Sequence, residues 1–277
     1  MGERALASRC QAPLVDAHRE YDTTFQTIGA AYEDTLVLLE EYAKLGKWEQ
    51  VVSSAQERNL LKKRSPHWIK KLLSHTCRRF FVPGLTLPPG DLVARACAAP
   101  GLGRVGAMQV LYQYVCESDP LIDRLIRGLI APALLRYDRF PLTKQRYRDF
   151  LEKEAETHTE LGNWTPTVKA VWERKFYAFM RSSNVMEPPP STETRRIMLR
   201  PEPFAFFFFG LLDQGSTLGQ VMNHRVWSRY FLREEDWDEL LSTCQVKGWL
   251  RYEGSGSVRQ IERTSPRLEE WVDGLGP

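Results

Sequence analysis

This sequence has few cysteines and no long hydrophobic stretch. Its five cysteines among 277 residues are scattered, odd in number and never in C-x-x-C spacing. That pattern argues against a disulfide framework or a structural zinc site and favours a reducing compartment. The longest apolar run, residues 204–212 with one glycine included, is far shorter than the roughly 20 residues of a membrane-spanning helix. The first ten residues lack the apolar segment of a signal peptide. We therefore expect a cytoplasmic protein without a membrane span.

Common catalytic motifs are missing as well. The chain contains no G-x-S-x-G, no P-loop and no H-E-x-x-H, and its five histidines form no metal-spaced pair. Residues 101–106 match G-x-G-x-x-G, but an alanine-rich segment ending in Pro100 precedes them, where a dinucleotide site needs a strand. We interpret this motif as a turn between helices. We expect no enzyme, cofactor or metal site, although a catalytic site assembled from distant residues stays open.

Acidic residues are absent from residues 58–90, which carry eight basic side chains. This local charge of +8 compares with +3 for the whole chain, so the remainder sums to −5. Concentrated positive charge attracts polyanions, and phosphate backbones are the commonest target. The alternative is a solvated basic surface with no partner. The basic residues are Arg58, Lys62, Lys63, Arg64, Lys70, Lys71, Arg78 and Arg79.

The pattern around this basic stretch predicts three helices. Residues 33–45 and 48–58 show helical spacing of apolar positions, and Gly46 separates them. Ser65 followed by Pro66 is a strong helix start, because serine caps free N–H groups and proline fits the first helical position. The third helix runs to about residue 80, with an apolar stripe at Ile69, Leu72, Leu73, Thr76 and Phe80. Two short helices before a basic amphipathic helix are typical of a helix-turn-helix.

This order predicts a DNA-binding region over residues 21–90. The helix beginning at Pro66 would enter the major groove, with the N–H groups beside Ser65 seating a phosphate. Lys62, Lys63 and Arg64 would hold the flanking strand. Three-helix units without any role in DNA binding are also common, and this alternative stays open. The further contacts expected from the helix are His67, Lys70, Lys71, Ser74, Arg78 and Arg79.

The middle of the chain reads as a helical bundle over residues 91–186. Asp119 before Pro120 and Thr165 before Pro166 repeat the cap-plus-proline helix start. No β-rich alternation appears in the first 180 residues, so we expect β structure mainly in the C-terminal hairpin. Three consecutive prolines then favour an extended linker over residues 187–202. Residues 1–20 are expected to be weakly ordered.

Residues 203–277 predict a winged-helix-like unit. Helices are expected over 203–213, after residue 216 or 217, and over 233–247, followed by a hairpin with a glycine-rich tip at 254–257. Arg251 and Arg259 on the hairpin could touch a DNA backbone. However, the helix in the recognition position begins with several carboxylates, which would repel phosphates. We therefore favour packing or a protein partner for this unit.

A series of short motifs runs through residues 20–185. Its members are Tyr21, Gly29, Ala30, Glu33, Thr35, the helix at Trp48, Asn59, Leu60, Leu61, Arg64, Ser65, Arg78, Arg79, the Phe150 region, Trp164, Thr165, Pro166 and Lys169. In this order they resemble the BrxA family of BREX bacteriophage-defence systems. The resemblance implies a small, mainly helical, non-enzymatic protein that binds double-stranded DNA beside the system's methyltransferase, ATPase and phosphatase-like components. A protein–protein adaptor and a transcriptional regulator are the alternatives.

Overall fold

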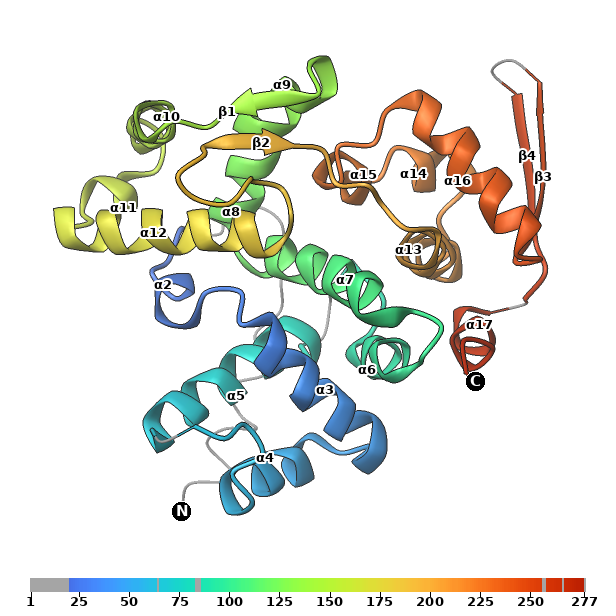
Figure 1. Cartoon of the computed structure of the whole chain (residues 1–277), viewed down its shortest axis with the longest axis horizontal. Helices are drawn as coiled ribbons and strands as arrows, with labels where there is room; N and C mark the ends of the chain where they lie inside the picture. The colour runs from blue at the N-terminus through green and yellow to red at the C-terminus, as the bar shows by residue number, and fades with distance from the viewer. Residues whose placement is uncertain (1–19, 64, 83–85, 256–257, 266, 277) are drawn as a thin grey trace.

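The computed structural model describes residues 20–63, 65–82, 86–255, 258–265 and 267–276 (Figure 1). Helices dominate this part of the chain, and its strands form two small antiparallel sheets. The predicted mainly α fold with a C-terminal hairpin is confirmed. The segment predicted to be weakly ordered lies outside the described residues, apart from Glu20.

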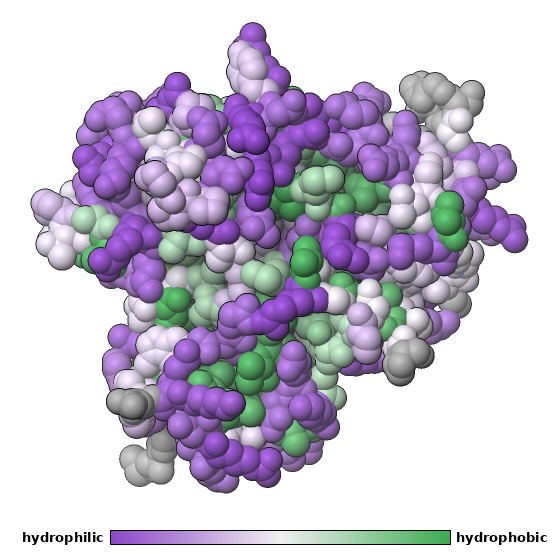
Figure 2. Space-filling view, viewed as in Figure 1, coloured by the Kyte–Doolittle hydropathy of each residue, from purple (hydrophilic) through white to green (hydrophobic). Residues whose placement is uncertain are grey.

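The N-terminal lobe contains α2 (Phe25–Ile28), α3 (Tyr32–Leu45), α4 (Trp48–Glu57) and α5 (Pro66–Phe80). The three predicted helices are thus found within one residue of the expected bounds. Ser65 caps α5, because its Oγ accepts a hydrogen bond from the Trp68 backbone N–H at 3.3 Å. The lobe has a hydrophobic core of its own, made by Ile28, Leu38, Val51, Ala55, Leu61, Ile69, Leu72 and Leu73. Figure 2 shows it as a projection beneath the main body with a largely hydrophilic surface.

The central region is built around one buried helix. Its elements are α6 (Gly90–Ala98), α7 (Gly103–Ser118), α8 (Pro120–Leu125), the π-helix η1 (Ile126–Ile130), α9 (Ala131–Arg136), α10 (Lys144–Ala155), α11 (Thr159–Gly162) and α12 (Pro166–Ser182). Helix α7 is buried on nearly all sides, with apolar residues such as Val110 and Tyr114 fully enclosed. Asp119 and Thr165 cap α8 and α12 as predicted. The G-x-G-x-x-G segment begins in the turn before α7, and its residues 103–106 form the first turn of that helix.

A small two-stranded sheet lies outside the C-terminal hairpin. Strand β1 (Arg139–Pro141) pairs antiparallel with β2 (Glu193–Arg195), with Phe140 opposite Thr194. Thr194 is buried, and its hydroxyl donates to the Phe140 carbonyl at 2.6 Å. This sheet adds a minor β element to the mainly α fold, and β2 lies within the proline-rich segment 187–202. Strands of three residues are too short to show a period-two pattern in sequence.

The C-terminal part packs onto the central helices. It comprises α13 (Pro201–Asp213), α14 (Leu218–Met222), α15 (Arg225–Arg229), α16 (Glu234–Val246), the hairpin of β3 (Leu250–Ser255) and β4 (Val258–Arg263), and α17 (Leu268–Asp273). Tyr230 donates its hydroxyl to the Gln109 carbonyl of α7 at 2.8 Å, and Tyr112 of α7 donates to the Arg229 carbonyl at 2.9 Å. One hydrophobic core therefore extends from Tyr21 to Leu275.

No helix in the described ranges is long and apolar enough to cross a membrane. Within the same ranges, no group of three or more potential metal ligands comes together. Cys97, Cys116 and Cys244 are free thiols, whereas Cys77 on α5 is disulfide-bonded. The pattern of cysteines in the sequence does not predict that bond.

Candidate nucleic-acid interface

Helix α5 separates its apolar and basic side chains onto different faces. Ile69, Leu72 and Leu73 are buried in the lobe, whereas His67, Lys70 and Lys71 are exposed. Lys62, in the turn before the helix, is also exposed. We call Lys62, His67, Lys70 and Lys71 the basic face. In the part of the chain that the structure describes, none of these four residues takes part in a salt bridge. Their polar groups are therefore available to an anionic partner.

Two predicted contact residues beside the basic face are engaged within the protein. The Lys63 Nζ atom lies 3.1 Å from Asp34 Oδ1 on α3 and 4.9 Å from the centre of the Trp68 ring. Arg78 donates to the Asp22 carboxylate at 3.0 Å. Both side chains remain 40% or more exposed, so both can still approach a phosphate. Ser74 is half-buried, and Arg64 lies outside the described residues.

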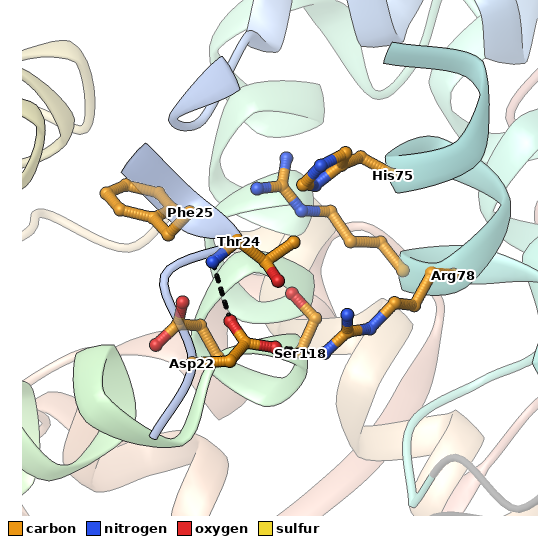
Figure 3. A pocket seen from close by; sticks show the side chains of 8 residues that line it. Asp22, Thr24, Phe25, His75, Arg78 and Ser118 are labelled. Carbon is orange, nitrogen blue, oxygen red and sulfur yellow. Dashed lines mark hydrogen bonds and ion pairs between the residues drawn. The ribbon is translucent and has the colours of Figure 1, made fainter. Parts of the chain in front are cut away.

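Arg78 lies at a small pocket between α5 and the segment before α2 (Figure 3). Figure 3 shows Asp22 directed toward Arg78, with Thr24, His75 and Ser118 around the same space. The Asp22 carboxylate also accepts the Thr24 backbone N–H at 2.8 Å. Burial, reinforced by the positive charges of Arg79 and Arg78, lowers the pKa of His75 to about 4. His75 is therefore neutral near pH 7 and adds no charge to this surface.

Arg79 differs from the prediction because it is only 4% exposed. Its guanidinium donates to the Gly29 carbonyl at 2.6 Å and to the Ala30 carbonyl at 2.9 Å, which ties α5 to the chain between α2 and α3. Burial lowers its pKa to about 10, so it remains charged at neutral pH. A side chain enclosed in this way cannot reach a DNA backbone. Helical spacing from Leu72 and Thr76 places position 79 beside the apolar stripe, and this signal was available in the sequence.

Replacing Arg79 with methionine should destabilise the fold by about 3 kcal/mol, because it removes the donors to two buried carbonyls. It also removes the positive charge facing Asp119, a buried carboxyl whose pKa burial raises to about 7. Thermal unfolding measures the change. The neighbouring variant Arg78→Met is the control, since its ion pair is exposed and worth at most about 1 kcal/mol. Equal stability of the two variants would contradict a structural role for Arg79.

The predicted contacts at the C-terminal hairpin lie far from α5. Figure 1 shows the hairpin at the opposite end of the molecule from the N-terminal lobe. Arg251 is exposed and lies 3.8 Å from Glu262 across the hairpin. Arg259 belongs to β4, but its side chain lies outside the described residues. The structure therefore does not unite the two predicted sets of residues. The exposed carboxylates on neighbouring α16 are Glu234, Glu235, Asp238 and Glu239.

A second group of arginines escaped the sequence analysis. Arg124 and Arg127 lie on α8 and η1, whereas Arg225 and Arg229 lie on α15. Together they line one cleft. Because the two segments are far apart in the chain, no local pattern reveals the group.

Comparison with known proteins supports the family assignment. The BrxA family model matches residues 19–207. A crystal structure of an uncharacterized protein from Magnetospirillum magneticum has a similar fold, with a TM-score of 0.56 and 12% sequence identity. That similarity covers 75% of this chain and 98% of the other. No curated protein matches the chain. Since the family model covers well over half of the residues, this chain belongs to the BrxA family, which suggests a component of a BREX phage-defence system.

Proposed function

We propose that this protein is a non-enzymatic component of a BREX system that binds duplex DNA through its backbone phosphates. The observation that carries this proposal is the basic face on and before α5. Its lysines are exposed, have no carboxylate partner among the described residues, and project from a helix whose opposite side is firmly packed. Flexible lysine ammonium groups bind phosphates as point charges, without reading the base sequence.

The α5 N-terminus adds to this surface. Ser65 satisfies the Trp68 N–H, and Pro66 has no N–H of its own. The backbone N–H of exposed His67 therefore remains beside the positive end of the helix dipole, next to Lys70 and Lys71. This arrangement suits one phosphate at the helix start and further phosphates along the lysines. In this proposal α4 and α5 form a helix-turn-helix.

We expect the purified protein to bind unrelated duplexes with similar, micromolar affinities at low salt, as non-specific binders do. Fluorescence anisotropy with two duplexes of equal length and different sequence measures this. Binding should weaken steeply as salt rises, because phosphate contacts release counterions. No binding at micromolar protein would refute the proposal. A strong preference for one sequence would instead favour a transcriptional regulator.

The C-terminal part favours a second candidate function, that of a protein–protein adaptor. In this proposal α13, α14, α15, α16 and the hairpin form a winged-helix-like unit, but the exposed face of α16 is acidic. Carboxylates in the recognition position oppose DNA and suit a basic protein surface. We propose that this unit contacts a partner, with the methyltransferase, ATPase and phosphatase-like proteins of BREX as candidates. If the protein is an adaptor, it should bind one of these partners even though it binds no DNA.

A further inference from the structure

A cleft on the main body gathers four arginines from distant parts of the chain. We call it the arginine cleft. Its volume of about 330 Å³ falls within the roughly 300–1,000 Å³ of typical ligand pockets. Two carboxylates line it against the four arginines, so its lining is positive overall. The lining residues are Tyr21, Cys116, Glu117, Pro120, Asp123, Arg124, Arg127, His158, Arg225 and Arg229.

The two signs of charge lie at different depths in this cleft. The Glu117 and Asp123 side chains are only 4% and 13% exposed, whereas those of Arg124 and Arg127 are 52% and 41% exposed. Arg229, which is buried, binds both carboxylates, with its Nε atom 2.7 Å from Asp123 and its Nη1 atom 2.8 Å from Glu117. The carboxylates are thus neutralised within the protein. An approaching ligand meets guanidinium groups first.

The two exposed guanidinium groups keep donors free. Arg127 uses Nε and Nη2 to bind Asp123, and Arg124 uses Nε and Nη2 to bind Glu154. Each guanidinium carries five N–H donors in a fixed plane. Nη1 of both residues has no hydrogen-bond partner in the described part of the chain. The ion pairs with Asp123 and Glu154 fix the orientation of the two guanidinium planes. The remaining N–H donors are therefore already positioned to bind an anion.

The arginine cleft lies next to the C-terminal end of α5. Asp22, which binds Arg78 of α5, directly follows Tyr21, which lines the cleft. The Tyr21 hydroxyl donates to Glu154 at 3.2 Å, and Glu154 binds Arg124. On the other side, Ser118 faces the α5 pocket in Figure 3, whereas its neighbour Glu117 lines the cleft. Neighbouring residues in the chain, Asp22 with Tyr21 and Ser118 with Glu117, therefore place Arg78 of α5 beside the arginine cleft.

We propose that the arginine cleft binds phosphates of the same DNA backbone that contacts the basic face, which extends the footprint from α5 onto α8 and η1. This inference rests on the proposed function, because the duplex must first engage α5. Guanidinium groups with ordered free donors match phosphate oxygens in geometry and charge. Sequence-independent binding is kept, since these contacts reach only the backbone.

The test compares a short and a long duplex. Helix α5 has 15 residues and is therefore about 22 Å long, close to the roughly 27 Å of an 8-bp duplex. The variant Arg124→Gln/Arg127→Gln should leave binding of the 8-bp duplex unchanged. It should weaken binding of a 30-bp duplex by roughly fivefold per lost contact at 0.15 M salt, with a log–log salt slope lower by up to about 1.8.

The control variant is Arg148→Gln/Arg195→Gln. These arginines are 57% and 44% exposed and also bind carboxylates, Glu173 and Glu187, but they lie outside the cleft. The control variant removes the same amount of positive charge as the cleft variant, and its affinity for the long duplex should stay close to that of the wild type. If the cleft variant unfolds, Arg127→Gln alone is used, because Asp123 then still has Arg229 as its partner.

The outcomes separate the two proposals. Unchanged binding of both duplexes by the cleft variant, with loss of binding in a Lys70 and Lys71 variant, would overturn only the role of the cleft. Equal losses on the short and long duplexes would also overturn the extended footprint. Cleft-dependent binding of inorganic phosphate without any effect on DNA would assign the cleft to a free anion. If neither set of variants affects DNA binding, both the basic face and the arginine cleft are wrongly assigned as the DNA-binding surface. If the wild-type protein binds no DNA, the proposed function itself fails.

Discussion

Replacing Lys70 and Lys71 with glutamine should weaken binding to every duplex by roughly 30-fold at 0.15 M salt. Each lost phosphate contact lowers the log–log salt slope by about 0.9, so two contacts lower it by about 1.8. The corresponding loss of binding free energy is about 2 kcal/mol. The loss should be the same for unrelated sequences, because the proposed contacts of both lysines are to backbone phosphates and not to bases. Anisotropy titrations at several salt concentrations provide the slope and the affinities.

The fold should survive this double change. Both lysines are exposed and lie off the buried stripe of α5, where substitutions usually cost less than about 0.5 kcal/mol. The control variant, Lys144→Gln/Lys153→Gln, removes the same charge from exposed positions of α10. We expect the control to retain wild-type affinity and slope. Equal losses in the two variants would show that net charge, and not the basic face, governs binding.

Replacing Arg229 with methionine should cost about 3 kcal/mol of stability. This arginine is 1% exposed and binds both Glu117 and Asp123. Its removal therefore leaves the negative charges of two buried carboxylates less completely balanced by positive charge. Breaking a buried pair typically costs about 3–5 kcal/mol. The lower end applies here because Arg225 still binds Glu117 and Arg127 still binds Asp123. The melting temperature should fall by roughly 6–12 °C.

The effect of Arg229→Met should depend on pH. Burial alone would raise the pKa of Glu117 and Asp123, but Arg229 and the other arginines hold both below their ordinary values of 4.5 and 3.8. A depressed carboxyl pKa contributes stability above its unfolded value, and that stability is lost as the pH falls through the folded one. The gap between variant and wild type should therefore be fully present at pH 7, begin to shrink below pH 4.5 for Glu117, and shrink further below pH 3.8 for Asp123.

The exposed variant Arg195→Met is the control for this measurement. Its ion pair with Glu187 lies at the surface and should contribute less than about 1 kcal/mol at any pH. A melting temperature for Arg229→Met equal to that of the control would mean that the buried network does not join α15 to α7 and α8. Calorimetric scans at pH 3.5 and pH 7 distinguish these results.

Local sequence signals were sufficient for most helices near the candidate site. Ser65, Asp119 and Thr165 each cap a helix, as their position before a proline predicts. The bounds of α5 and the exposure of Lys70 and Lys71 follow from the same few residues. Capping and the apolar stripe involve neighbours within one or two turns of helix, so the sequence already contains both partners of each interaction.

The partners of charged residues depend on contacts between distant segments. Nothing near Lys63 or Arg78 in sequence announces their pairing with Asp34 and Asp22. The β1–β2 sheet likewise joins two strands that three helices separate in the chain. The arginine cleft exists only because α15 packs against α7 and α8. Helical periodicity in the sequence indicates which side of a helix is apolar. Which segments then become neighbours depends on how those apolar sides pack in the tertiary structure. That selection decides which cations are neutralised within the protein and which remain available to an anionic partner.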